Sequence, residues 1–175
     1  MIPQAEMSSS GAGLEARGEG WFVVNAREAA WREHADFGRV CRFEGDVRFA
    51  QFGINIHVLM PGQPNCMYHG EDVQEDFLVL SGECLLLVEG EERRLTAWDF
   101  VHCPAWTEHV FVGAGDGPCA ILMVGARPDV KVRYPVSELA RRHGAGVDED
   151  TDDPGQAYAR FGANVATPYL EGDLP

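Results

Sequence analysis

An imidazole and several carboxylates lie within the ten residues of segment 68–77, YHGEDVQEDF. On a β-strand, side chains two residues apart share a face, so His69 and Glu71 are expected to point the same way. Glu75 follows after a bend that can carry the chain into the next strand. Imidazole and carboxylate groups together are suitable ligands for divalent zinc, iron, manganese, cobalt or nickel. The segment therefore predicts a metal site.

The elements that must position these groups are short β-strands. Between residues 47 and 127, apolar runs of strand length alternate with turn residues. Residues 52–58 alternate apolar and polar side chains, which is the period of a half-buried strand. Further strands are expected at 77–80, 85–88, 98–103, 109–112 and 120–124. Seven or eight strands at nearly even spacing predict an all-β barrel or sandwich over 47–127.

The segment before the barrel predicts two other kinds of structure. Residues 1–20 are rich in Ser and Gly without periodicity, which predicts a flexible N-terminal arm. Residues 21–46 are expected to pack on the barrel through a short strand at 21–24 and a short helix at about 25–35. Asn25 can cap that helix, with Glu28 three residues further on.

The segment after the barrel, residues 128–175, predicts a C-terminal extension. Short helices are expected at 137–142 and 155–160, on either side of an acidic loop at 148–153. We expect this extension to pack over the barrel or to contribute to a dimer.

A first motif of this chain resembles that of the cupins. In that family the motif runs Gly, five residues, His, one residue, His, three or four residues, Glu, six residues, Gly. Here Gly62, His69, Glu75 and Gly82 occupy the corresponding places, with one extra residue after the first glycine. Glu71 stands at the place of the second histidine.

A second motif resembles the other half of the family pattern, which runs Gly, five residues, Pro, one residue, Gly, two residues, His, three residues, Asn. Trp98, Pro104, Trp106, His109 and Gly113 occupy these places. Only the proline and the histidine keep the residue type of the family. The two motifs occur in the family order within an evenly spaced β pattern, which makes the resemblance specific.

The resemblance covers about residues 47–127 and implies an all-β cupin, a double-stranded β-helix or jelly-roll barrel with short peripheral helices. It implies that His69, Glu75 and His109 take the metal positions of the family and that Glu71 fills the position of the missing histidine. One divalent transition metal (zinc, manganese, iron, nickel or cobalt) would balance two imidazoles and two carboxylates. Glu71 either binds the ion itself or accepts a hydrogen bond from another ligand.

The other histidines and the cysteines give weaker signals. His57 lies on the polar face of its strand, where a surface position and a pocket wall are equally good interpretations. His102 is expected to be structural, and His34 and His143 to be exposed on helices. The five cysteines show no CxxC pair, which argues against a disulfide framework or a cysteine-rich zinc site. Cys103 leaves a redox role open.

Composition limits the partners of the chain. A net charge of −14 argues against nucleic acid and against anionic membrane surfaces. No apolar run approaches the roughly 20 residues that span a bilayer, and residues 1–20 lack the pattern of a secretory signal. We therefore expect a cytoplasmic protein that binds a small molecule. A homodimer is also expected, because exposed strand edges are usually covered.

Three kinds of function remain open at this point. The first is an enzyme that acts on a small polar metabolite by metal-assisted chemistry, as an isomerase, lyase or dioxygenase. The second is a non-catalytic module that binds a small ligand or a sugar, with or without a metal. The third is a scaffold for a dimer.

Overall fold

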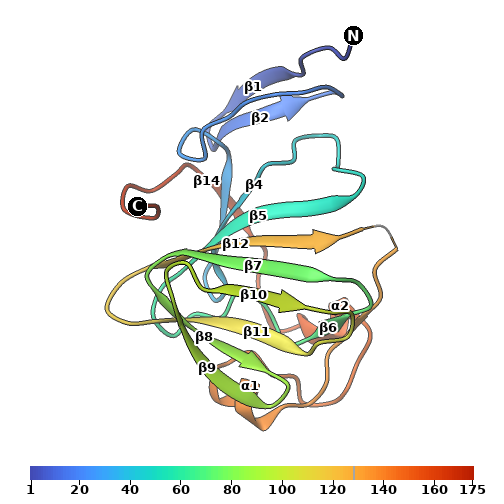
Figure 1. Cartoon of the computed structure of the whole chain (residues 1–175), viewed down its shortest axis with the longest axis vertical. Helices are drawn as coiled ribbons and strands as arrows, with labels where there is room; N and C mark the ends of the chain where they lie inside the picture. Colours follow the sequence, from blue (N-terminus) through green and yellow to red (C-terminus); the bar gives the residue numbers. More distant parts are fainter. Residues whose placement is uncertain (128) are drawn as a thin grey trace.

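The structure is a computed structural model that describes residues 1–127 and 129–175, and its largest element is a sheet of seven antiparallel strands (Figure 1). In order across the sheet these strands are β10 (Phe100–Cys103), β7 (Glu75–Ser81), β12 (Cys119–Ala126), β5 (Phe52–Leu59), β4 (Gly38–Arg42), β3 (Trp31–His34) and β14 (Val165–Thr167). The strands expected at 52–58, 77–80 and 120–124 are all present in this sheet.

A second sheet of three strands faces β7 and β12 of the first (Figure 1). It consists of β11 (His109–Ala114), β8 (Glu83–Val88) and β9 (Glu91–Thr96), in that order. A short ladder of β6 (Gly70–Glu71) with β13 (Val132–Arg133) completes the barrel region. The prediction of an all-β fold is confirmed.

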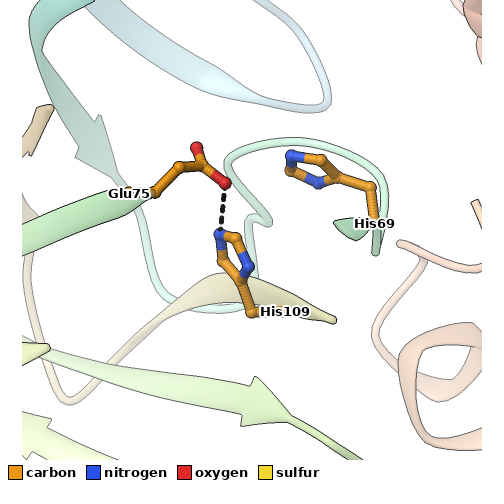
Figure 2. Close-up of side chains that lie close together, drawn as sticks. All are labelled: His69, Glu75 and His109. Atoms are coloured by element: carbon orange, nitrogen blue, oxygen red, sulfur yellow. Dashed lines mark ion pairs between the residues drawn. The ribbon is translucent and has the colours of Figure 1, made fainter. Parts of the chain in front are cut away.

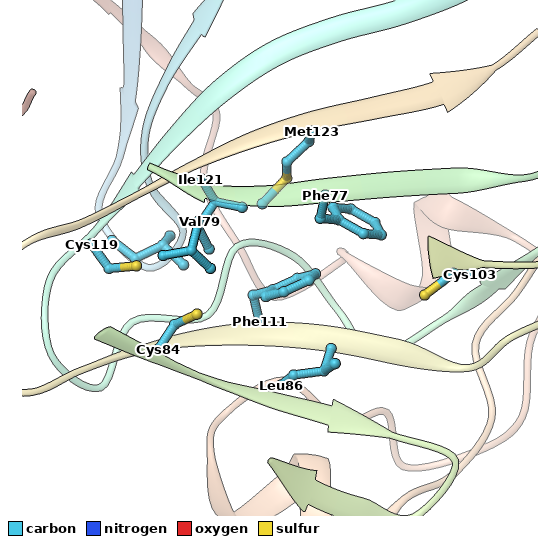
Figure 3. Close-up of a cluster of buried hydrophobic side chains, with 10 residues drawn as sticks. Phe77, Val79, Cys84, Leu86, Cys103, Phe111, Cys119, Ile121 and Met123 are labelled. Carbon is cyan, nitrogen blue, oxygen red and sulfur yellow. The ribbon is translucent and has the colours of Figure 1, made fainter. Parts of the chain in front are cut away.

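The core lies between the two sheets, and Figure 3 shows its side chains meeting from both sides. Phe77 and Ile121 come from the seven-stranded sheet, and Leu86 and Phe111 come from the three-stranded sheet. All four are at most 5% exposed. Burial of large apolar side chains contributes roughly 1.5–3 kcal/mol each, so this cluster is the main reason why the two sheets stay together.

The seven-stranded sheet is buried on its other face as well. Ile56 of β5 and Ala120 of β12 pack there against Trp31, which is fully buried. Tyr169 and Leu174 from the C-terminal end of the chain join this second cluster. The sheet therefore extends beyond residues 47–127, because β3, β4 and β14 add strands from outside these bounds.

The N-terminal segment is a hairpin and not a flexible arm. Strands β1 (Glu6–Ser10) and β2 (Gly13–Arg17) pair antiparallel along their whole length. The Ser10 hydroxyl closes the turn by accepting a hydrogen bond from the Ala12 N–H at 3.2 Å. Three consecutive serines, Ser8 to Ser10, belong to β1 because β2 lies beside them, and the low apolar content of this segment gave no sign of that pairing.

Residues 21–35 also differ from the prediction. The expected strand at 21–24 is absent, and Trp21 makes only an isolated bridge with Gln4. The expected helix is absent too, because the chain forms one turn at Asn25 and then enters β3. The Trp31 indole N–H donates to the Ala26 carbonyl at 2.8 Å, which fixes the tryptophan beneath the sheet. Burial of Trp31 in the sheet outweighs the weak local preference for helix.

The C-terminal extension carries the two short helices of the described chain, α1 (Glu138–Arg142) and α2 (Pro154–Ala157). The Ser137 hydroxyl caps α1 by accepting from Ala140 N–H at 3.2 Å, as expected for a helix over 137–142. Helix α2 begins one residue before the expected segment and ends at Ala157. Within the described residues, neither helix is long or apolar enough to cross a bilayer.

Two tryptophans adopt a backbone conformation that normally favours glycine. Trp98 has φ 75° and Trp106 has φ 69°. These are the positions at which the second cupin motif has glycine. The turns of that motif are therefore preserved here, and two non-glycine residues carry their strain.

Candidate metal centre

Three side chains from different strands converge at one end of the barrel (Figure 2). His69 immediately precedes β6, Glu75 begins β7 and His109 begins β11. One ligand atom from each lies within 4.8 Å of the others. The backbones of the two histidines are antiparallel partners, with His109 N donating to His69 O at 2.8 Å. This pairing brings two imidazoles side by side, with ring centroids 5.1 Å apart.

Backbone carbonyls fix the tautomer of both histidines. Nδ1 of His69 lies 2.8 Å from the Met67 carbonyl oxygen, and Nδ1 of His109 lies 3.0 Å from that of Thr107. A carbonyl oxygen only accepts, so each Nδ1 carries the proton and donates it. Each Nε2 is then left with its lone pair. An imidazole held in this way is prepared to bind a metal through Nε2.

Burial keeps the groups of this centre uncharged. It lowers the pKa of His69 to about 3, with a contribution from nearby His109, and it also lowers the pKa of His109. Burial, with a contribution from the charge of neighbouring Glu71, raises the pKa of Glu75 to about 8. Among residues 1–127 and 129–175, no Lys or Arg side chain lies within ion-pair distance of Glu75. A divalent cation would supply a positive charge there, so the donor set fits such an ion.

Glu71 lies beside this group but is not one of its three members. Its Oε1 is 3.8 Å from Nε2 of His69, and its side chain is 25% exposed. Burial followed by the charge of Asp72 raises its pKa. Of the four predicted ligands, the structure thus brings three into one group and places the fourth at its edge.

The three side chains open onto a cavity of about 360 Å³. Asn55 and His57 of β5 line its wall, together with Arg48 and Arg127. The Asn55 Oδ1 and His57 Nδ1 atoms are buried and have no hydrogen-bond partner among the described residues. A small polar molecule in the cavity would therefore meet both metal ligands and unpaired polar groups.

The sequence profile of the cupin domain family matches residues 55–125, which contain His69, Glu75 and His109. This part of the chain is a cupin domain. The all-β cupin fold that the two motifs implied is thereby confirmed.

Three known proteins are similar to this chain over the cupin domain and beyond it. The gentisate 1,2-dioxygenase 1 of Aquipseudomonas alcaligenes is 28% identical over 110 residues, which are 63% of this chain and 31% of that protein. The chain thus spans about a third of the length of this curated relative. A sugar phosphate isomerase of the cupin superfamily from Silicibacter pomeroyi has a TM-score of 0.52 at 24% identity, over 79% of this chain and 83% of its own. The polyketide cyclase RemF from Streptomyces resistomycificus has a TM-score of 0.53 at 16% identity, over 63% and 83%. The two solved structures bear on the fold alone.

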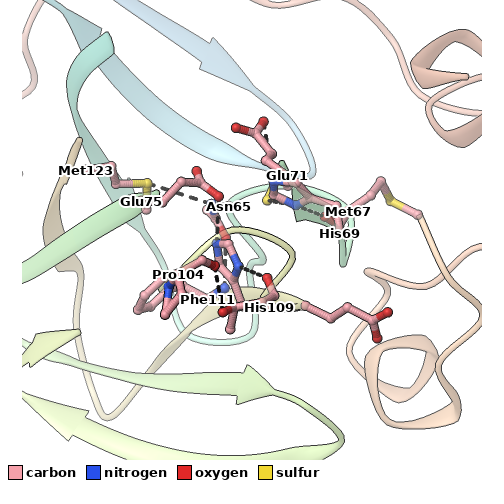
Figure 4. A network of polar contacts seen from close by, with 12 residues as sticks. Asn65, Met67, His69, Glu71, Glu75, Pro104, His109, Phe111 and Met123 are labelled. Carbon is pink, nitrogen blue, oxygen red and sulfur yellow. Dashed lines mark hydrogen bonds and ion pairs between the residues drawn. The ribbon is translucent and has the colours of Figure 1, made fainter. Parts of the chain in front are cut away.

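Asn65 is a residue of the cupin site that the sequence motifs do not include. Its Oδ1 accepts from Phe111 N–H at 2.8 Å, and its Nδ2 lies 3.7 Å from Sδ of Met123 (Figure 4). It therefore joins the loop before His69 to strands of both sheets. Nothing in the local sequence distinguishes this asparagine from an ordinary loop residue that follows a proline.

Two cysteines near the candidate ligands are a half-buried thiol, Cys66, and a buried one, Cys103. Sγ of Cys66 lies 3.7 Å from Nδ1 of His69, and burial raises the pKa of Cys66 well above its usual value. Cys103 is the register partner of Glu75 but packs into the core, where burial raises its pKa to about 12. Both stay protonated near neutral pH, which gives no support to the redox role that was left open for Cys103.

The structure assigns the remaining histidines to different settings. His57 is on the cavity wall, one of the two positions that its strand periodicity allowed. His102 bonds Asp76 through Nδ1 at 2.7 Å and is half exposed. His143 follows α1 as its C-terminal cap. His34 contradicts the prediction of an exposed helical residue, because it is buried on β3 and contacts the Gly162 carbonyl at 2.9 Å.

The C-terminal extension supports the segment that carries His69. Tyr158 accepts a hydrogen bond from Met67 N–H through its hydroxyl at 3.1 Å, and Tyr68 N–H donates to the Ala145 carbonyl at 2.8 Å. The ring of Tyr134 lies 5.9 Å from that of His69. Residues outside the cupin match thus hold His69, one of the candidate ligands, in place.

Proposed function

We propose that this chain is a metal-dependent cupin enzyme that acts on a small polar molecule. His69, Glu75 and His109 would hold one divalent ion. The observation that carries the proposal is the pair of imidazoles with Nε2 lone pairs that meet a carboxylate within 4.8 Å beside a cavity. Three protein ligands leave coordination positions for a substrate, as catalytic metal sites require.

Iron(II) is the ion that this donor set favours first. Two histidines and one carboxylate are typical of non-haem iron(II) oxygenases. The relative from Aquipseudomonas alcaligenes, named as a gentisate 1,2-dioxygenase, supports a dioxygenase reaction as the first candidate. When bound, iron(II) would supply the open positions and the electron chemistry for dioxygen activation.

Residues of the chain would orient the two imidazole rings and bind the ligand in the cavity. Nδ1–H bonds to Met67 and Thr107 hold both imidazole rings in a fixed direction. Phe77 packs against His109 with ring centroids 5.1 Å apart and closes the cavity toward the core. Asn55 and His57 offer polar atoms to a ligand on the opposite wall.

Glu71 could bind the ion directly or interact with a residue that binds it, and we assign it the second role. It lies outside the three-residue group, so we propose that it interacts with His69 and adjusts the charge of the site without binding the ion.

A homodimer is also proposed. Strand β10 lies at the edge of the seven-stranded sheet, and its Phe100 is 64% exposed. An uncovered edge that carries an apolar side chain is a favourable place for a second copy to pair. Light scattering coupled to size exclusion would test this, with Phe100→Ser expected to shift the protein toward the monomer.

The proposed function is tested by the metal content of the purified protein. Wild type and Glu75→Gln are purified without affinity tags and analysed for bound metals, with Glu91→Gln on the exposed strand β9 as the control. We expect about one iron per chain in wild type and control, and almost none in Glu75→Gln. No metal at all would favour the non-catalytic binding module. Stoichiometric zinc that iron(II) cannot replace would exclude the dioxygenase reaction and retain a non-redox enzyme.

A further inference from the structure

Four arginines gather around a second cavity, of about 430 Å³, next to the metal cavity. They are Arg32 of β3, Arg42 of β4, Arg48 and Arg127. The chain has 28 acidic residues against 14 Lys and Arg, so its surface is mainly negative. A concentration of positive charge at one place in such a protein needs a specific reason.

Three of these four guanidinium groups have no ion-pair partner in the described part of the chain. Glu44 pairs with Arg127 through both carboxylate oxygens, and Glu15, which also lines this cavity, pairs with Arg17 at 3.1 Å. Across the described residues, no carboxylate lies within ion-pair distance of the other three members, Arg32, Arg42 and Arg48. Burial and the charge of Arg32 lower the pKa of Arg42, and the charge of Glu44 offsets only part of this effect.

The arginine cavity borders the metal cavity. Arg48 and Arg127 line both. The guanidinium of Arg127 lies over Gly53, where a Cβ atom would meet it at 2.8 Å. Gly53 is the register partner of Gly125, and Gly125 is the register partner of Glu75. Between Glu75 and Arg127, the sheet therefore carries two glycines and no larger side chain.

Polar atoms without hydrogen-bond partners lie on the same face of the sheet as the arginines. Arg42 is the register partner of Asn55, and Val40 is that of His57. Side chains at alternate positions of a strand share a face, so Asn55 and His57 lie on the face that carries Arg42. The buried Asn55 Oδ1 and His57 Nδ1 atoms lack partners among the described residues. The arginines, the amide and the imidazole therefore form one polar surface that begins at the metal centre.

We propose that this surface binds the oxyanion group, a phosphate or a carboxylate, of the molecule whose other end enters the metal centre. Arg42 and Arg48 would bind the anion, Arg32 would add positive charge, and Arg127 would be held in position by Glu44. The planar fork of arginine matches both kinds of oxyanion through paired hydrogen bonds. The inference rests on the proposed function for the position of the reacting end, but the anion site can be measured by itself.

The test is a calorimetric titration of inorganic phosphate and, separately, of malonate, at constant ionic strength set with sodium chloride. Wild type is compared with Arg42→Gln, Arg48→Gln and Arg93→Gln. The last removes the same charge from an exposed position on β9 in the other sheet and is the matched control. The metal content and the thermal unfolding of each sample are measured in parallel, so that a misfolded variant is recognised.

We expect saturable binding of at least one of the two anions to wild type and to Arg93→Gln. Arg42→Gln and Arg48→Gln should each bind it at least about tenfold more weakly, because each loses a charge-assisted hydrogen bond, and their metal content should be unchanged. The anion that binds more tightly identifies the oxyanion.

Three results would overturn the inference. The first is no saturable binding of either anion to wild type, and the second is wild-type affinity in both Arg42→Gln and Arg48→Gln. The third is a loss of affinity in Arg93→Gln as large as in those two variants. If wild type binds metal but no anion, the inference fails while the proposed function stands. If it binds the anion but no metal, the proposed function fails while the anion site stands.

Discussion

Nε2 of His109 lies 3.6 Å from Oε2 of Glu75, and the two residues come from facing sheets. This separation is too long for a hydrogen bond, and the His109 proton is already donated from Nδ1 to Thr107. The contact therefore brings the Nε2 lone pair of His109 and a carboxyl oxygen of Glu75 close together without a hydrogen bond between them. Such an arrangement is satisfied by a cation that both atoms can bind.

The first prediction concerns His109 itself. His109→Ala should lose most of its bound metal while the barrel stays folded, because the ligand set falls from three to two. His102→Ala is the matched control, since His102 is half exposed and bonds Asp76 away from the ligand group. Elemental analysis and circular dichroism of the two variants provide the measurement. A full metal complement in His109→Ala would remove this residue from the site.

The second prediction separates Glu71 from Glu75. Glu71→Gln should keep the metal with an affinity about 10–100-fold lower, as is typical when a group that supports a ligand is changed. Glu75→Gln should lose the metal. Competition with a metal-binding dye measures both affinities. An equal loss in the two variants would show that Glu71 binds the ion directly.

The third prediction uses the strained turn at Trp98. This residue has φ 75° and is 74% exposed, so its side chain adds strain and little packing. Trp98→Gly should be more stable than Trp98→Ala by about 1 kcal/mol, because glycine occupies this region without a Cβ clash. The alanine variant removes the same side chain and keeps the strain. Urea unfolding of the two variants gives the difference, and equal midpoints would show that the turn is relaxed.

The fourth prediction is a pH dependence that comes from His57. Burial, helped by the charge of Arg42, lowers the pKa of His57 from 6.5 to about 4. Between these two values the unfolded chain binds more protons than the folded chain, so stability falls as the pH falls. From pH 7 to pH 5, metal-free wild type should lose about 2 kcal/mol more unfolding free energy than metal-free His57→Gln.

Urea unfolding at the two pH values, after treatment with a chelator, measures this effect. The same comparison removes the contributions of the other histidines, which both proteins share. Parallel losses in wild type and variant would mean that the imidazole is hydrated in the folded protein.

The strands and the grouping of the three candidate ligands could be predicted from the sequence because both depend on short-range spacing. Phe52 to Val58 alternate strictly, and the two cupin motifs fix His69, Glu75 and His109 through counted intervals. The N-terminal region was mispredicted because its structure depends on distant partners. Trp31 forms a strand only because β4 and β14 are present on either side of it.

The arginine surface could not be predicted from the sequence for the same physical reason. Arg32, Arg42, Arg48 and Arg127 lie far apart in the chain, and each is an ordinary charged residue in its local sequence. Their proximity depends on the order β12-β5-β4-β3 in the sheet. Local periodicity specifies which face a side chain occupies, but it does not specify which strand is the neighbour.

The ligand group joins elements from three parts of the fold at this end of the barrel. Glu75 belongs to the seven-stranded sheet, His109 to the three-stranded sheet, and His69 to the segment beneath the C-terminal extension. A bound ion would act as a removable clasp across one end of the barrel, while Cys84 and Cys119 pack the other end without it. Chelation should therefore loosen the molecule from one end only. Amide hydrogen exchange would then rise at Gly70–Glu71 and at the start of β11, and stay slow where β8 pairs with the far end of β11.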